Sequence, residues 1–148
     1  MRHLTVDVLA PGALIAVEIG VGESLRRALI REGKPVPPAV QIDLLIDTGA
    51  SRTSVDTSVM RTLGLEPRSA TEYTDFSSKG LSKQTDVYVV ELVLGGVGTG
   101  NTWRHDPLEV LTESFLNLPH QGLLGRDVIN RGQLSYNGAT RKCTLSYT

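Results

Sequence analysis

The sequence predicts a mostly β domain with a few short helices, and three observations support that class. Its 148 residues include 15 glycines and 7 prolines, which separate short apolar runs in the way that turns separate strands. Residues 87–94 are rich in valine and have the strongest β-propensity of the chain. The pair Asn137-Gly138, between the runs 133–136 and 142–147, is typical of a β-hairpin turn. Strands joined by turns are therefore expected to form most of the chain.

The first third of the chain predicts two strands and one helix. Residues 4–8 and 13–19 are apolar runs separated by Pro11-Gly12, which favours a pair of strands. Between residues 23 and 32, apolar side chains at positions 25, 28 and 29 have helical spacing, and Gly33 marks the end of the helix. The three arginines of this helix are expected on its solvated side, and the proline-rich residues 34–38 form a stiff connector.

The next segment predicts a strand, a turn and a second short helix. Residues 40–46 form an apolar strand that ends at Asp47. Residues 55–63 favour a helix, with Asp56 as its N-cap and Gly64 as its end. The tripeptide Asp56-Thr57-Ser58 resembles the Asp-Thr-Gly at residue 47 only superficially, because it lacks the glycine and no apolar strand precedes it. We interpret Asp56 as a helix cap.

The second half alternates strands with glycine-rich turns. Residues 71–84 are polar, with Phe76, Gly80 and Leu81 among them, and they lead into the strand at 87–94. Residues 95–100 predict a turn and not a phosphate-binding loop, because the lysine and the strand–loop–helix context are missing. Residues 108–111 favour a weaker strand, and residues 126–131 a short helical piece that ends at Gly132.

Composition and charge limit the classes of function. Apolar residues make up 40% and charged residues 21%, a balance typical of one globular domain, which we place at residues 1–148. The net charge of −1 provides no strong field for nucleic acid or for an anionic membrane, so neither is an expected partner. The N-terminus lacks the pattern of a signal peptide, and no uncharged run approaches the length of a membrane span. The expected location is the cytoplasm.

Cysteine and histidine usage argues against disulfide and metal chemistry. Cys143 is the only cysteine, so an internal disulfide is excluded, and its place on an apolar strand face favours a core position. His3, His105 and His120 are scattered and do not have the spacing of zinc ligands. We therefore expect no metal and no other cofactor.

One short stretch carries most of the chemical information. Three apolar residues run directly into an aspartate and a glycine turn, in the order Leu44-Leu45-Ile46-Asp47-Thr48-Gly49-Ala50-Ser51. A carboxylate at the end of an apolar strand is expected to lie deep against apolar walls, where its protonation can be tuned. The motif occurs once in the chain.

A second motif follows about 75 positions later and is read together with the first. It consists of an apolar pair between two glycines, then Arg and Asp, in the order Gly122-Leu123-Leu124-Gly125-Arg126-Asp127. Together the two motifs resemble those of the retropepsin-like aspartic proteases, the single-domain relatives of retroviral proteases. The order of strands, polar hairpin, helix and terminal strand is also similar over most of residues 8–147. The resemblance implies a closed β-barrel of the acid-protease fold, with one lobe per chain.

The resemblance also implies roles for individual residues. Asp47 matches the catalytic aspartate, and Thr48 matches the residue whose hydroxyl reaches across the dimer axis to the partner backbone. Gly49 matches the position where only a hydrogen permits close backbone approach, and Ala50 and Ser51 close the turn. The residues that brace the active-site loop in this family are matched by Gly125, Arg126 and Asp127.

Two departures from the family pattern are visible. Retroviral enzymes commonly carry an acidic residue soon after Asp-Thr-Gly-Ala, and it pairs with the family arginine. This chain has Ser51, Arg52 and Thr53 there, so Arg126 needs another partner. The chain is also longer than a minimal retroviral domain, partly through residues 20–38.

A single Asp-Thr-Gly per chain implies that two chains form one active site. Peptide hydrolysis of this type needs two carboxyl groups that share a proton, one as base for water and one to polarise the carbonyl. The second aspartate must come from a second copy across a two-fold axis. We therefore expect a homodimeric aspartic endopeptidase with an extended peptide or protein as substrate. Residues 142–147 are a candidate dimer strand, as in retroviral relatives, but the sequence does not decide this.

Other interpretations remain open at this point. Residues 71–84, including Phe76, Gly80 and Leu81, are a candidate flap over the substrate, and the alternative is an ordinary exposed hairpin. The chain could also use the retropepsin fold without catalysis, as a dimerisation or peptide-binding module. An unrelated β-barrel with a small ligand would require both motifs to be coincidental.

Overall fold

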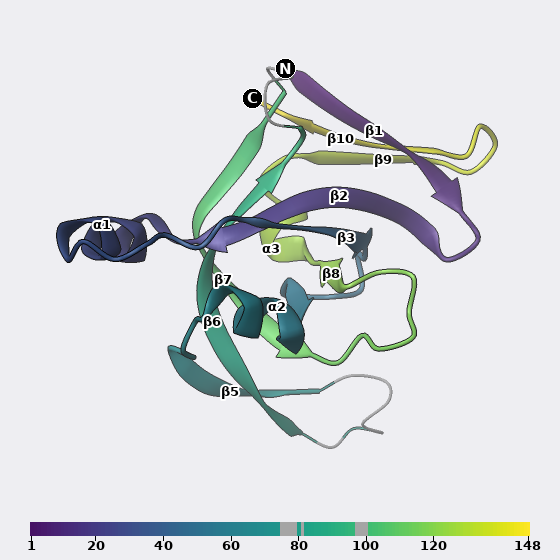
Figure 1. Ribbon diagram of the computed structural model, residues 1–148. Coiled ribbons are helices and arrows are strands. Elements are labelled where there is room, and N and C mark those ends of the chain that lie inside the picture. The colour runs from purple at the N-terminus through teal and green to yellow at the C-terminus, as the bar shows by residue number, and fades with distance from the viewer. Residues whose placement is uncertain (75–79, 81, 97–100) are drawn as a thin grey trace.

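The computed structural model describes residues 1–74, 80, 82–96 and 101–148, which fold around a closed ring of strands (Figure 1). The ring contains, in spatial order, β2 (Gly12–Val21), β3 (Val40–Ile46), β8 (Gly122–Leu124), β4 (Ser54–Asp56), β7 (Trp103–Glu113) and β6 (Lys83–Leu94). Pairing of β6 with β2 closes it. The predicted class, a mostly β chain with a closed barrel and few short helices, is confirmed.

Four further strands extend the ring at its two ends. β5 (Ser69–Tyr73) pairs with β6 and forms a hairpin that leaves the barrel at the bottom of Figure 1. At the other end, β1 (Arg2–Leu9) continues from β2, and β10 (Lys142–Tyr147) lies between β1 and β9 (Gln133–Asn137). These three strands form a separate layer above the barrel (Figure 1).

The strand order places the turn after β3 at a crossing point. β8 lies between β3 and β4, parallel to β3 and antiparallel to β4. The segment 47–53, which joins β3 to β4, must therefore pass over the end of β8. This crossing brings Asp47 beside the residues that follow β8, namely Gly125 and helix α3 (Arg126–Ile129).

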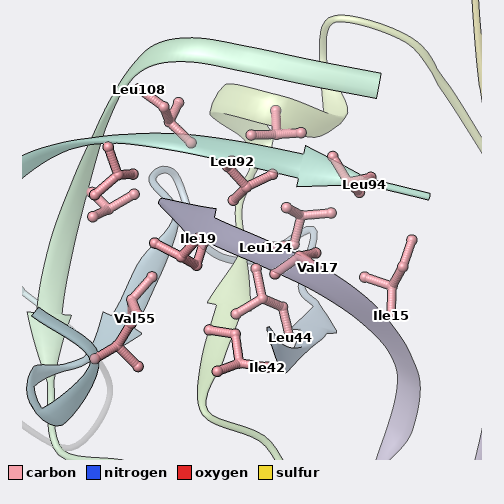
Figure 2. Packing of buried hydrophobic residues seen from close by; sticks show 14 of the residues in the cluster. Ile15, Val17, Ile19, Ile42, Leu44, Val55, Leu92, Leu94, Leu108 and Leu124 are labelled. Atoms are coloured by element: carbon pink, nitrogen blue, oxygen red, sulfur yellow. The ribbon is translucent and has the colours of Figure 1, made fainter. Parts of the chain in front are cut away.

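The core lies inside the ring, where alternate side chains of each strand point inward. In β2, Ile15, Val17 and Ile19 are at most 4% exposed, while the residues between them lie nearer the surface. Burial of each such side chain contributes about 1.5–3 kcal/mol to folding. Figure 2 shows ten labelled members of this cluster, contributed by six strands: Ile15, Val17, Ile19, Ile42, Leu44, Val55, Leu92, Leu94, Leu108 and Leu124.

Helix α2 (Thr57–Leu63) agrees closely with the sequence prediction. The Asp56 side chain accepts a hydrogen bond from the Ser58 amide at 3.0 Å, so it caps the helix as expected. Gly64 ends the helix in the left-handed region, with φ 67°, where glycine is favoured. Val55, expected at the start of the helix, lies in β4 instead, because it pairs with Gly122 and Thr112.

Helix α1 (Glu23–Arg31) forms where predicted, but its apolar side does not pack into the core. None of its residues is buried, and Leu25 and Ile30 are 41% and 64% exposed. The helix projects from the side of the barrel (Figure 1) and is held at its start, where the Glu23 amide donates to the Asp106 carboxylate. Arg26, expected on the solvated side, is ion-paired to Glu91 at 3.3 Å.

Two strands are longer than the apolar runs that predicted them. β6 begins at Lys83, ahead of the expected start at Val87, because its polar first residues pair with β5. β7 extends through charged residues on both sides of the expected 108–111, and Arg104 is accommodated there by Glu91 and Asp106 on the surface. The predicted turn at 95–100 lies largely outside the described residues.

Candidate active site

Asp47 stands at the end of β3, where the strand gives way to the crossing segment. Its amide donates to the Leu124 carbonyl at 3.0 Å, which continues the pairing of β3 with β8 by one residue. The side chain is half-buried and borders an open cavity of about 340 Å³. The expectation of a deeply buried carboxylate is therefore wrong for the single chain, because one side of Asp47 faces this cavity.

The turn after Asp47 holds one carboxylate oxygen in place. Oδ1 accepts a hydrogen bond from the Gly49 amide at 2.8 Å, and the Ala50 amide donates to the Asp47 carbonyl at 3.1 Å. A Cβ atom at Gly49 would lie 3.1 Å from Oδ1, so a side chain there would crowd the carboxylate. Within the described residues Oδ2 has no hydrogen-bond partner, and Asp47 is one of the residues that line the cavity.

Thr48 is exposed beside Asp47, and it is held through its backbone. Its carbonyl oxygen accepts a hydrogen bond from the Arg126 guanidinium at 2.8 Å. In the part of the chain that the structure describes, its hydroxyl makes no hydrogen bond. The Thr48 side chain is therefore available at the surface, at the position that the family motif assigns to contact with a partner.

Gly125 allows β8 and the crossing segment to come into contact. A Cβ atom at this position would lie 2.5 Å from the Arg52 carbonyl carbon and 2.8 Å from the Thr53 nitrogen. Both distances are shorter than side chains tolerate, so only glycine fits without a shift of backbone. The next residue continues the contact, because the Arg126 amide donates to the Ala50 carbonyl at 2.8 Å.

Asp127 anchors the other end of the crossing segment. Its Oδ2 accepts from the Thr53 amide at 2.9 Å, and its Oδ1 accepts from the Thr53 hydroxyl at 2.7 Å. Thr53 is 0% exposed, so these bonds satisfy two polar groups that water cannot reach. The Thr53 hydroxyl oxygen in turn accepts from the Gly125 amide at 3.1 Å.

The structure brings both sequence motifs together and provides the missing partner for Arg126. That partner is a backbone oxygen, Thr48 O, and the family's acidic residue is not needed for the contact. Ser51 is exposed, and the Arg52 guanidinium forms an ion pair with Glu109 at 3.4 Å. The segment from Asp47 to Thr53 is thus fixed at several points by β8 and α3.

Several residues that line the cavity beside Asp47 were not predicted from the sequence to lie there. Its lining includes Leu45 from β3, the Pro11-Gly12 turn, and Leu134 and Tyr136 from β9. The alternation in the terminal hairpin indicates that Leu134 and Tyr136 share an apolar face. Only the sheet order shows that this face lies against the Asp47 turn.

The candidate flap is described only in part. The hairpin of β5 and β6 is present, and Gly80 is exposed with φ 81°. Phe76 and Leu81 lie outside the described residues. The assignment of residues 71–84 as a flap stays a prediction.

The described residues contain no cluster of three or more His, Cys, Asp or Glu side chains placed to bind a metal ion. Within the same residues, no helix combines the length and the apolar character that a membrane crossing requires.

Comparison with known proteins agrees with this geometry. The structure is similar to that of a retropepsin-like aspartic protease from Rickettsia conorii, with a TM-score of 0.58, 14% identity, and coverage of 98% of this chain and 90% of that one. The fold is thus retropepsin-like. Residues 32–128 match the aspartyl protease family, and this range includes both motifs. The chain belongs to the aspartyl protease family. Among curated proteins, no match is found.

Proposed function

We propose that this chain is an aspartic endopeptidase that acts as a homodimer, with Asp47 of each copy at a shared active site. The observation that supports it best is the single Asp47 turn, which presents a free carboxylate oxygen at an open cavity while β8 and α3 hold its backbone. Such a turn keeps the carboxylate in position without filling the space in front of it. One chain provides one carboxyl group, and the reaction requires two.

In this mechanism the two Asp47 carboxyl groups share one proton, because two adjacent carboxylates cannot both ionise at low cost. The ionised carboxylate removes a proton from water, and the water oxygen attacks the scissile carbonyl carbon. The protonated carboxyl group donates its proton to the carbonyl oxygen. The C–N bond then breaks as the carboxyl group that took the proton from water passes it to the departing nitrogen. One hydroxyl of the tetrahedral intermediate returns its proton to the other carboxylate, which leaves the carboxylic acid product and restores the shared proton.

The proposal includes the extended binding of a peptide between the Asp47 turns and the β5–β6 hairpins. Thr48 is proposed to donate its hydroxyl to the backbone of the second copy and so to couple the two turns. Its exposed side chain and its backbone contact with Arg126 support this role. The hairpin is proposed to close over the substrate and exclude water.

The decisive experiment measures cleavage of a mixed peptide library at pH values from 4 to 8. Asp47→Asn is expected to lower kcat/KM by at least about 10³-fold, because the dyad loses its base. Asp43→Asn is the matched control, since Asp43 is an exposed aspartate of the same strand, four positions earlier. Equal cleavage by the Asp47→Asn variant would show that another residue performs the reaction.

A second measurement separates the enzyme from a silent module of the same fold. Thr48→Ala is expected to weaken self-association in sedimentation equilibrium and to lower activity in parallel, whereas Thr48→Ser retains the hydroxyl and both properties. If the wild-type protein forms a dimer that Thr48→Ala weakens, but never cleaves peptide, the chain is a dimerisation module.

A further inference from the structure

The terminal strand expected to join two copies has no free edge. β10 pairs with β1 along its whole length on one side, in register Leu4↔Leu145. On the other side residues 142–146 pair with β9, in register Leu134↔Leu145. Its backbone groups are therefore occupied within one chain. A second copy must bind elsewhere, and the strand that ends the layer is β9.

The outer edge of β9 is open. Across the described residues, no backbone hydrogen bond reaches Gln133–Asn137 from any strand other than β10. The first residues of β1 are also unpaired with β2. That edge of β1 is not open to solvent in the same way, because it faces β2 across a cavity of about 220 Å³. Open strand edges are templates for pairing with another chain.

β9 lacks the features that keep strand edges from associating. Its five residues, Gln-Leu-Ser-Tyr-Asn, contain no charge and no proline. At the opposite end of the sheet, β5 contains Glu72 and directly follows Arg68. Charged residues or proline commonly protect an edge strand from pairing with another chain. The edge of β9 has neither, which fits a strand that pairs with a partner.

The same strand borders the Asp47 turn. Leu134 and Tyr136 line the 340 Å³ cavity together with Asp47 and Thr48. Tyr136 is nevertheless 61% exposed, which is unusual for a large ring that faces the apolar side of its sheet. A copy that pairs along β9 lies next to the Asp47 turn and covers this ring.

We propose that two copies of this chain associate through β9, antiparallel about a two-fold axis at Ser135. Each copy then contributes three strands to one continuous sheet beneath the two Asp47 turns. Leu134 of one copy lies opposite Tyr136 of the other, and Ser135 lies opposite itself. That two copies are needed follows from the proposed function, on which this inference rests. That β9 joins them follows from the order of strands in the sheet.

Ser135 is suited to the axis position. It is the central residue of β9, it is exposed, and its side chain is small. Side chains directly opposite each other in antiparallel strands have Cβ atoms about 4.5–5.5 Å apart, so like charges placed there repel. Thr5, Thr144 and Ser135 are directly paired across the three strands, so they lie on the same face of the layer. Thr5 is the matched control, because it lies on that face but two strands away from the β9 edge.

The first test compares the self-association of Ser135→Asp and Thr5→Asp by sedimentation equilibrium at neutral pH. Ser135→Asp is expected to raise the dissociation constant at least about tenfold, because two carboxylates meet on the axis. Thr5→Asp is expected to leave it unchanged. Circular dichroism confirms that both variants are folded. An unchanged dissociation constant for Ser135→Asp overturns the proposal, and so does a wild-type protein that stays monomeric.

The second test uses a disulfide as a distance probe. Ser135→Cys is expected to form a covalent dimer with oxidised glutathione, because opposed strand residues fall within the Cα separation of 4.4–6.8 Å that a disulfide spans. Thr5→Cys is expected not to. Cys143 is 1% exposed and does not compete. A Ser135→Cys protein that cross-links no faster than Thr5→Cys contradicts pairing at β9.

Peptide cleavage distinguishes failure of this inference from failure of the proposed function. If Ser135→Asp remains a dimer and cleaves peptide in an Asp47-dependent manner, the function stands and the β9 interface is wrong. If the wild-type protein associates through Ser135 but never cleaves peptide, the interface stands and the proposed function fails.

Discussion

In the proposed function the Asp47 turn and the β5–β6 hairpin both contact substrate, but the two segments are held in opposite ways. The turn is held by Arg126 and Asp127, which lie 74 to 78 positions later in the chain and bind Thr48 O, Ala50 O and Thr53. Among the described residues, β5 pairs with β6 and with no other strand. The difference teaches that this fold fixes the Asp47 carboxylate through contacts from distant residues, while the position of the β5–β6 hairpin depends on its own strand pairing.

Removal of the Asp127 carboxylate is the most direct way to test whether α3 holds the Asp47 turn. Asp127→Ala leaves the buried amide and hydroxyl of Thr53 without a partner, and is expected to lower the free energy of unfolding by about 2–4 kcal/mol. Asp127→Asn retains one acceptor and is expected to lose less. Urea unfolding of both variants measures the difference. Equal stability of Asp127→Ala and wild type would show that α3 does not support the turn.

Acid is expected to weaken the same support through His105. Burial, followed by the nearby Arg131 guanidinium, lowers the pKa of His105 from 6.5 to about 4. Between these values the unfolded chain binds more protons than the folded one. Stability therefore falls as the pH drops from 6.5 to 4 and levels off below, with about 3 kcal/mol lost in total.

The Arg131 guanidinium donates to His105 Nδ1 at 2.9 Å, so a proton on that nitrogen would also break this contact with the segment after α3. Urea unfolding at pH 7.5 and pH 4 checks the prediction, with His105→Gln as the comparison. The decrease between the two pH values should be smaller in the variant by about the amount given above. An identical decrease would assign the acid sensitivity to other groups.

A smaller effect is expected for Arg126, whose guanidinium makes one hydrogen bond to a surface turn. Arg126→Met should lower the free energy of unfolding by about 1 kcal/mol. If the proposed function is correct, kcat/KM should fall further than stability, because the Thr48 backbone loses its support. Arg31→Met on α1 is the control for loss of a surface arginine. Unchanged kcat/KM in Arg126→Met would mean that the remaining contacts position the turn alone.

The smallest effect on stability is expected in the hairpin. Gly80 has φ 81°, where a side chain is disfavoured, and nothing lies within 4 Å of an added Cβ atom. Gly80→Ala should change the free energy of unfolding by about 1 kcal/mol or less, and should lower kcat/KM several-fold if the segment closes over substrate. Gly33→Ala is the matched control, because Gly33 has φ 69° and equally open surroundings and lies just past the end of α1. The same kcat/KM in both variants would argue against a flap.

Much of the fold could be predicted where local signals agreed. Asp56 and Gly64 mark the ends of α2 because a side-chain cap and a left-handed glycine are local requirements. The terminal hairpin was predicted from Asn137-Gly138, and both strands form. β7 was harder to predict, since its charged residues interrupt the apolar pattern. They are accommodated by cross-strand and helix partners, such as Glu91 and Glu23 for Arg104, that the local sequence does not reveal.

In the candidate site, too, some contacts could be predicted from the sequence and others could not. The two motifs predicted that Asp47, Thr48 and Gly49 would lie near Gly125, Arg126 and Asp127, and they do. The sequence could not indicate that Arg126 binds a backbone oxygen, because no residue type identifies such a contact. It also could not place Tyr136 beside Asp47, since that depends on the order of strands in the terminal layer.

The double pairing of β10 inside one chain has a kinetic consequence. In the proposed assembly no strand of one molecule is interleaved between strands of the other, so each polypeptide reaches its folded state without waiting for an encounter. Maturation then becomes a second-order process, and newly made molecules at low abundance stay dormant. If the proposed function is correct, dilution of the purified protein switches hydrolysis off while leaving each subunit intact.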